Sequence, residues 1–152
     1  MLQRLEGKNA IITGASSGIG RAIAQAFLRE GADLLVTAKE NTDALDTLRE
    51  EAKAAGRRLH AIRLACEHPS AVDELFTTAV STLGHIDILV NNAAFASRSP
   101  FLETSFAEYE AIQAANARFP FFAVQRFANL IKERKSGGSV INIASVSGYR
   151  AT

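Results

Sequence analysis

Residues 10–20 of the chain are AIITGASSGIG, and this stretch decides the fold. Residues 10–13 are mostly apolar and branched, which is typical of a short buried strand. Three glycines follow, at Gly14, Gly18 and Gly20. Glycine allows a tight turn, a close approach of the backbone to a ligand, and close packing of the next element. The stretch therefore predicts a strand that runs into a glycine-rich turn.

A helix is predicted directly after this turn. Ile19, Ile23 and Phe27 fall on one helical face, and Gly31 can end the helix in a left-handed conformation. The N-terminus of such a helix presents free amide groups and a positive dipole end to a diphosphate. The order of strand, turn and helix favours a dinucleotide site over a plain connecting loop. No Lys-Ser or Lys-Thr pair follows Gly20, so the turn is not a nucleoside-triphosphate loop.

Short apolar runs and helical stretches continue to alternate along the chain. Most of the runs lack polar–apolar alternation, which favours a parallel sheet that is covered on both faces. In such sheets the crossovers are right-handed and ligands bind beyond the carboxyl ends of the strands. We therefore predict an α/β fold, a doubly wound parallel sheet in one domain over residues 1–152. Further strands are expected at 34–37, 59–64, 86–90 and 139–143, and further helices at 42–55, 70–84 and from 105 onward.

The last helix carries its own start and stop signals. Ser105 and Glu108 fit a capping box at its beginning. Pro120 interrupts the apolar pattern, so we expect a kink or a break there, followed by continuation of the helix. The pair Gly137-Gly138 is expected to end it.

Composition excludes several classes of protein. Lys and Arg number 17 against 16 Asp and Glu, so the formal charge is +1 and a general nucleic-acid binder is not expected. Cys66 is the only cysteine, which excludes an internal disulfide and favours a reducing, cytoplasmic location. No apolar run approaches the roughly 20 residues that span a bilayer, so no membrane segment is expected. The three histidines are scattered without ligand spacing, so no metal site is predicted.

The glycine spacing belongs to a larger set of motifs. Asn91-Asn92-Ala93-Ala94 follows the fourth predicted strand, Asn116 lies in the long helix, and Ser145 follows the fifth strand. Together with the glycine turn, these motifs resemble the short-chain dehydrogenase/reductase family over the whole chain. The resemblance implies a Rossmann-type sheet with strand order 3-2-1-4-5. It also implies hydride transfer between a nicotinamide cofactor and a carbonyl or alcohol carbon of a small-molecule substrate, commonly by a homodimer or homotetramer.

The resemblance assigns roles to the cofactor-binding residues. Asn91 and Ala93 match the segment that holds the central sheet and lines the nucleoside pocket. The family pattern there is Asn-Asn-Ala-Gly, and Ala94 departs from it at the last position. The residues that match the family's diphosphate-binding loop are Gly14, Ser16, Ser17, Gly18, Ile19 and Gly20.

The end of the second predicted strand bears on the choice of cofactor. An acidic residue there would bind the ribose 2′-hydroxyl of NAD and repel a 2′-phosphate, but this chain has Ala38 followed by Lys39. Lys39 resembles the basic residue of NADP-preferring members, although Glu40 stands beside it. We predict that NADP is preferred and that NAD is possible. Where family members carry an aspartate beside the adenine, this chain has Ala65; either that hydrogen bond is absent or Glu67 supplies it.

Two residues are implied to take part in catalysis. Ser145 matches the family's catalytic serine, whose hydroxyl holds the substrate carbonyl oxygen, where negative charge develops. Ser147 is a competitor for that role, and a serine that satisfies local backbone is the simpler alternative. Asn116 matches a residue of a proton relay through water; without the resemblance it would be interpreted as a polar surface residue.

The family's Tyr-x-x-x-Lys pair is missing from the sequence. That tyrosine comes roughly a dozen residues after the serine, and Tyr149 is too close to Ser145 to match, so we interpret it as a loop residue. Two explanations remain open. We favour a longer enzyme of which these residues are the cofactor-binding part, because a sheet with an uncovered edge folds poorly alone. Alternatively, the protein ends at Thr152 and is a non-catalytic nucleotide-binding module or scaffold of the same fold, with Phe119, Phe121 and Phe122 exposed.

Overall fold

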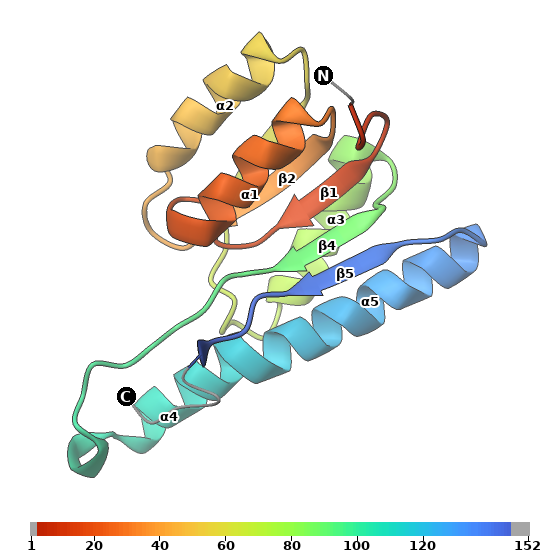
Figure 1. Cartoon of the computed structure of the whole chain (residues 1–152). Helices are drawn as coiled ribbons and strands as arrows, with labels where there is room; N and C mark the ends of the chain where they lie inside the picture. The colour runs from red at the N-terminus through yellow and green to blue at the C-terminus, as the bar shows by residue number, and fades with distance from the viewer. Residues whose placement is uncertain (1–2, 147–152) are drawn as a thin grey trace.

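The computed structural model describes residues 3–146, which form a five-stranded parallel sheet with helices on both faces (Figure 1). The strand order is β3-β2-β1-β4-β5, and every neighbouring pair is parallel, which confirms the predicted α/β topology. The strands are β1 (Asn9–Ile12), β2 (Asp33–Ala38), β3 (Leu59–Arg63), β4 (Ile88–Asn91) and β5 (Ser139–Asn142). The helices are α1 (Gly18–Arg29), α2 (Ala44–Ala54), α3 (Ala71–Leu83), α4 (Phe106–Gln113) and α5 (Phe119–Arg134), with a 3-10 turn η1 (Phe101–Glu103) and a π-helical turn η2 (Ala114–Arg118).

The core has one apolar layer on each side of the sheet. Ile12 and Val36 pack toward α1 and α2, whereas Ile11 and Leu35 pack toward α3 and α5. All four residues of β1 and of β4 are buried, and so are five of the six in β2. Adjacent residues of one strand therefore enter opposite layers. This explains why the central strands are apolar without alternation.

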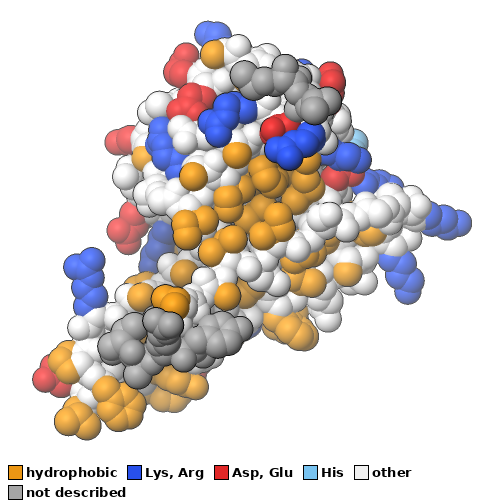
Figure 2. Space-filling model, viewed as in Figure 1, with side chains coloured by type: hydrophobic (Ala, Val, Ile, Leu, Met, Phe, Trp, Pro, Cys, Tyr) orange, Lys and Arg blue, Asp and Glu red, His pale blue; other side chains and the backbone are white. Residues whose placement is uncertain are grey.

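Strand β5 differs from the prediction in its burial. Its residues are exposed, including Val140 at 38% and Ile141 at 39%. Within residues 3–146 it pairs only with β4. Helices α1 and α2 lie over the β3-β2-β1 half of the sheet and leave the same face open beside β5 (Figure 1). Figure 2 shows hydrophobic side chains gathered on this open face beside β4 and β5. The apolar run in the sequence thus identified the strand correctly. The burial of its side chains depends on the elements that pack against it.

The long helical segment is irregular where the sequence predicts it. The π-helical turn η2 separates α4 from α5, and Pro120 lies in the first turn of α5. A proline in the first turn costs no hydrogen bond, because the amide groups there have no partner within the helix. The capping box is confirmed, since the Glu108 amide donates to the Ser105 hydroxyl at 3.2 Å. The predicted C-terminus is wrong, because the helix ends at Arg134 and the next residue, Lys135, has a left-handed φ of 53°.

Burial also corrects one expectation about this segment. Phe119 is only 3% exposed and belongs to the apolar layer between α3, α5 and the sheet, whereas Phe121 and Phe122 are 65% and 45% exposed. Among the helices of residues 3–146, none is long and apolar enough to cross a bilayer.

Candidate cofactor site

A cleft of about 1450 Å³ lies beyond the carboxyl ends of the strands, where an α/β sheet is expected to bind its ligand. Segments that follow all five strands contribute to its walls, together with η2 and the start of α5. Gly20 is the one predicted site residue that does not line it. The other predicted site residues all do, namely Gly14, Ser16, Ser17, Gly18, Ile19, Lys39, Asn91, Ala93, Asn116 and Ser145.

The glycine turn has a shape that other residues would disturb. Gly14 and Gly18 have positive φ values of 69° and 54°, a region that side chains rarely adopt. At Gly20 the reason is packing, because a Cβ atom would lie 2.3 Å from the Gly14 carbonyl oxygen and 2.3 Å from the Asn92 Nδ2 atom. Gly20 therefore lets α1 pack closely against the turn without itself facing the cleft.

Helix α1 begins with amide groups that face the cleft end of β1. Its N-cap residue, Ser17, makes no side-chain capping bond, and the first turn carries no acidic residue. The first amide groups of a helix have no partner within it and carry a partial positive charge. Ile19 is 60% exposed and lines the cleft beside them. This helix end can accept an anionic group from the cleft.

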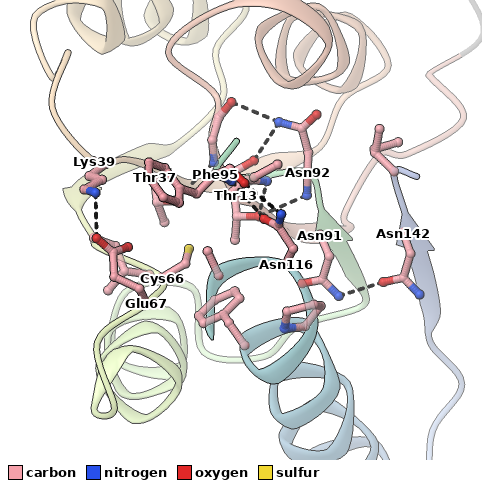
Figure 3. Close-up of a pocket in the computed structure, with 18 of the residues that line it drawn as sticks. Thr13, Thr37, Lys39, Cys66, Glu67, Asn91, Asn92, Phe95, Asn116 and Asn142 are labelled. Carbon is pink, nitrogen blue, oxygen red and sulfur yellow. Dashed lines mark hydrogen bonds and ion pairs between the residues drawn. The ribbon is translucent and has the colours of Figure 1, made fainter. Parts of the chain in front are cut away.

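Thr13 and Asn92 fasten the glycine turn to the end of β4 (Figure 3). The Thr13 hydroxyl accepts hydrogen bonds from the amides of Asn92 and Ala93, both at 3.0 Å. The Asn92 side-chain amide donates to the carbonyl oxygens of Thr13 and Gly14, again at 3.0 Å. From the sequence, Asn92 was predicted only as part of a motif, and no role was predicted for Thr13. The available signal was its position, as the one polar residue at the end of the apolar run directly before Gly14.

Asn91 links the ends of β4 and β5. Its Nδ2 group donates to Asn142 Oδ1 at 2.9 Å, and its side chain is nearly buried (Figure 3). Its Oδ1 atom has no hydrogen-bond partner among residues 3–146. Asn91 thus holds the two strands together at the floor of the cleft.

Asn116 lies in the π-helical turn and binds the loop after β4. Its Oδ1 atom accepts from the Phe95 amide and its Nδ2 group donates to the Phe95 carbonyl oxygen, both at 2.8 Å. The side chain therefore fixes the position of this loop through both of its polar atoms. Ser145, which follows β5, lines the same cleft, whereas Ser147 and Tyr149 lie outside the described residues.

Lys39 stands at the other end of the cleft, after β2. Its Nζ atom is 2.6 Å from Glu67 Oε1 and 5.3 Å from the centre of the Phe95 ring. Partial burial raises the pKa of the Glu67 carboxyl, but the hydrogen bond and charge of Lys39 outweigh it, so the pKa lies below its ordinary value. From the sequence, Glu67 was an alternative hydrogen-bond partner for adenine, and this ion pair was not predicted.

Cys66 is buried beside this pair, in a position that disfavours its thiolate form. It is 6% exposed, and burial, with a smaller contribution from the Glu67 charge, raises the pKa of its thiol to about 12. The residues that the structure describes contain no group of three or more His, Cys, Asp or Glu side chains that could hold a metal ion.

Comparison with known proteins agrees with this architecture. The family model for short chain dehydrogenase matches residues 8–152. The chain belongs to this family. It is 37% identical over 147 residues to sorbitol dehydrogenase of Cereibacter sphaeroides, a match that covers 97% of the chain and 56% of that enzyme. The chain thus spans little more than half the length of such short-chain dehydrogenase relatives.

Solved structures of the short-chain dehydrogenase family superpose closely on the chain. A metagenomic short-chain oxidoreductase in complex with NADP gives a TM-score of 0.88 at 32% identity, covering 98% of the chain and 66% of that protein. A 7α-hydroxysteroid dehydrogenase, complexed with NADH and 7-oxo glycochenodeoxycholic acid, gives 0.89 at 33% identity, covering 99% and 58%. The sheet order and flanking helices are those of a Rossmann-type fold.

Proposed function

We propose that the cleft binds a nicotinamide dinucleotide, with NADP(H) preferred, for hydride transfer to or from a carbonyl or alcohol carbon of a small molecule. The observation that carries this proposal is the uncapped N-terminus of α1, which follows a glycine turn and opens into a cleft lined by all five strand ends. Solved relatives of the same family hold NADP or NADH. The amide groups at Gly18 and Ile19 would bind the diphosphate.

The residues around the cleft suggest how the two ends of the cofactor lie. Strand β1 is central, so a dinucleotide at its end can extend toward β2 on one side and β4 on the other. The adenosine end would lie by Lys39, which can neutralise a 2′-phosphate. Ala38 stands where an NAD-selecting aspartate would lie, and the carboxylate at this end of the cleft is that of Glu67, which pairs with Lys39.

When bound, the nicotinamide supplies or accepts the hydride. The Ser145 hydroxyl would donate a hydrogen bond to the substrate oxygen, which becomes negative as the hydride arrives at the carbonyl carbon. Asn116 would position the loop after β4 on the same side of the cleft, in keeping with its two hydrogen bonds to Phe95. Its part in a proton relay remains a prediction.

Titration of the chain with NADPH and NADH, followed by nicotinamide fluorescence or calorimetry, tests the cofactor proposal. Tighter binding of NADPH is expected, because only NADPH carries the ribose 2′-phosphate that Lys39 would neutralise. Tighter binding of NADH would refute the preference. If the folded chain binds neither NADPH nor NADH at high cofactor concentration, the proposed site is refuted.

A second candidate function is a non-catalytic nucleotide-binding module of the same fold. Such a module would bind the cofactor through the same glycine turn and helix end without proton transfer to a substrate. Assay of purified chain with NADPH and a panel of small ketones separates the two functions. Tight NADPH binding without turnover would support the module, and turnover would support the enzyme.

Substitution of the serine provides the catalytic prediction. In protein that turns over, Ser145→Ala should lower kcat by about 10²–10³, the effect of losing one donor to a developing oxyanion. The Kd of NADPH should stay within about twofold, because the serine is placed beside the substrate rather than the cofactor. Steady-state kinetics and a parallel titration measure both quantities, and unchanged kcat would remove Ser145 from the mechanism.

A further inference from the structure

Lys39 is already engaged by a carboxylate in the cleft where we propose that it meets a phosphate. The ion pair with Glu67 joins the segments that follow β2 and β3, and its two side chains point toward one another (Figure 3). The same ammonium group lies over the Phe95 ring. Both members of the pair line the cleft, so a ligand that needs the cation must compete for it.

The backbones on both sides of the pair are fixed by other side chains. Arg63 Nε donates to the Lys39 carbonyl oxygen at 2.9 Å, and Arg118 Nη2 donates to the Glu67 carbonyl oxygen at 2.6 Å. Each arginine comes from a regular element or its edge, β3 for Arg63 and the π-helical turn for Arg118. A change of partner at Lys39 therefore requires movement of side chains and not of the two loops.

The pair is exposed enough to exchange. The Lys39 side chain is 47% exposed and that of Glu67 is 28% exposed, and ion pairs in such positions contribute little net stability. A 2′-phosphate brings close to two negative charges at neutral pH, whereas the Glu67 carboxylate brings one. The phosphate can therefore replace Glu67 as the partner of the Lys39 ammonium group. The Glu67 carboxylate then lies beside the phosphate, and the two negative charges repel each other.

We propose that Glu67 is a specificity-determining residue: it competes with the 2′-phosphate for Lys39 and thereby lowers affinity for NADP(H) while leaving NAD(H) unaffected. This inference rests on the proposed function, because it concerns the phosphate end of the same cofactor. It assigns a role to the segment after β3 in setting how strongly the two cofactors are distinguished. The preference for NADP(H) over NAD(H) is thus weaker than it would be if Lys39 had no carboxylate partner.

Removal of the Glu67 charge tests the competition. Glu67→Gln keeps the size of the side chain and should lower the Kd of NADPH by about three- to tenfold, with the Kd of NADH within about twofold. Glu133→Gln is the matched control, because Glu133 is exposed near the end of α5 and does not line the cleft. It should change neither Kd by more than about twofold. Glu67→Ala repeats the measurement if the glutamine variant fails to melt cooperatively.

A double substitution shows whether the effect passes through Lys39. In a Lys39→Met background, Glu67→Gln should no longer tighten NADPH binding. An unchanged ratio of the two Kd values in Glu67→Gln would overturn the inference. An equal gain in Glu133→Gln, or a gain that persists without Lys39, would overturn it too. If the unsubstituted chain binds neither cofactor, both the proposed function and this inference are refuted. If the unsubstituted chain binds NADPH but the Glu67 substitutions leave the Kd of NADPH unchanged, the inference fails and the proposed function stands.

Discussion

At the scale of single residues, the candidate site depends on small side chains and on side chains that use every polar atom. Gly20 leaves room for the carbonyl group of Gly14, and Thr13 accepts two amide hydrogen bonds while its side chain is buried. Asn116 uses both ends of its amide on Phe95. These residues bind no ligand by themselves, but they decide where the ligand-facing backbone lies.

Gly20→Ala is expected to damage both folding and cofactor binding. The new Cβ atom would lie 2.3 Å from a backbone oxygen, so the turn must shift, at a cost of about 1–3 kcal/mol. The displaced turn should also weaken NADPH binding. Urea unfolding and NADPH titration measure the two effects. Gly137→Ala is the control, because a Cβ atom there meets nothing within 4 Å; equal losses in both variants would contradict the packing argument.

At the scale of elements, one buried carboxylate joins three parts of the fold. Asp87, just before β4, accepts hydrogen bonds from the Asn9 amide at 3.0 Å and from Arg134 at 2.8 Å, and His85 lies 3.3 Å away. Asn9 begins β1 and Arg134 ends α5. The end of the sheet opposite the cleft is therefore held by a charge network, whereas the cleft end is held by amide and hydroxyl groups.

Asp87→Asn should lower stability in a way that depends on pH. Partial burial raises the pKa of the Asp87 carboxyl, but the hydrogen bonds from Asn9 and Arg134 outweigh it, so the pKa lies below its ordinary value. A carboxyl with a lowered folded-state pKa stabilises the protein above its unfolded pKa of about 3.9, and this stabilisation is lost as the pH falls through the folded-state pKa. The substitution should therefore cost about 1–3 kcal/mol at neutral pH and less at about pH 3.

Urea unfolding of both proteins at the two pH values measures this difference. Glu50→Gln is the control, because Glu50 is exposed in the middle of α2. It should leave the free energy of unfolding within about 0.5 kcal/mol at either pH. If the difference in the free energy of unfolding between Asp87→Asn and the unsubstituted protein is the same at both pH values, the assigned direction of the Asp87 pKa is contradicted.

The sequence predicted elements better than the contacts between them. The positions of β1 to β5 follow from apolar runs, and the capping box at Ser105 follows from two residues three apart. The Thr13–Asn92 and Lys39–Glu67 contacts join residues that are distant in sequence, so no local pattern contains them. The end of α5 at Arg134 was missed because the backbone turns left-handed at Lys135, before the glycines are reached.

At the scale of the whole molecule, the described surface carries apolar groups that a small monomer would normally cover. Figure 2 shows orange side chains at the end of the molecule formed by the loop after β4 and by α4. Phe101 is 90% exposed, Leu102 92% and Phe106 78%. Such a surface is typical of an interface between protein chains.

We propose that the chain forms a homodimer or homotetramer through this aromatic surface and α5. Light scattering should give a mass of two or four times 16.3 kDa, and Phe106→Glu should shift the population toward the monomer because it places a charge in the interface. Lys53→Gln, on the exposed side of α2, should leave the mass unchanged. A monomeric mass at all protein concentrations would contradict the proposal.

The π-helical turn between α4 and α5 also restricts how this region can vary in length. A wide turn holds one residue more than an α-helical turn does, so deleting any residue from 114–118 would leave a regular, fully bonded helix. The helices on either side would keep nearly the same relative rotation, because the wide turn absorbs its extra residue, but the side chains within 114–118 would move to new positions around the helix axis. Asn116 would then swing away from Phe95, and the loop between them would lose its anchor. Natural variants should consequently insert or delete residues in the neighbouring loop and keep the count within this turn.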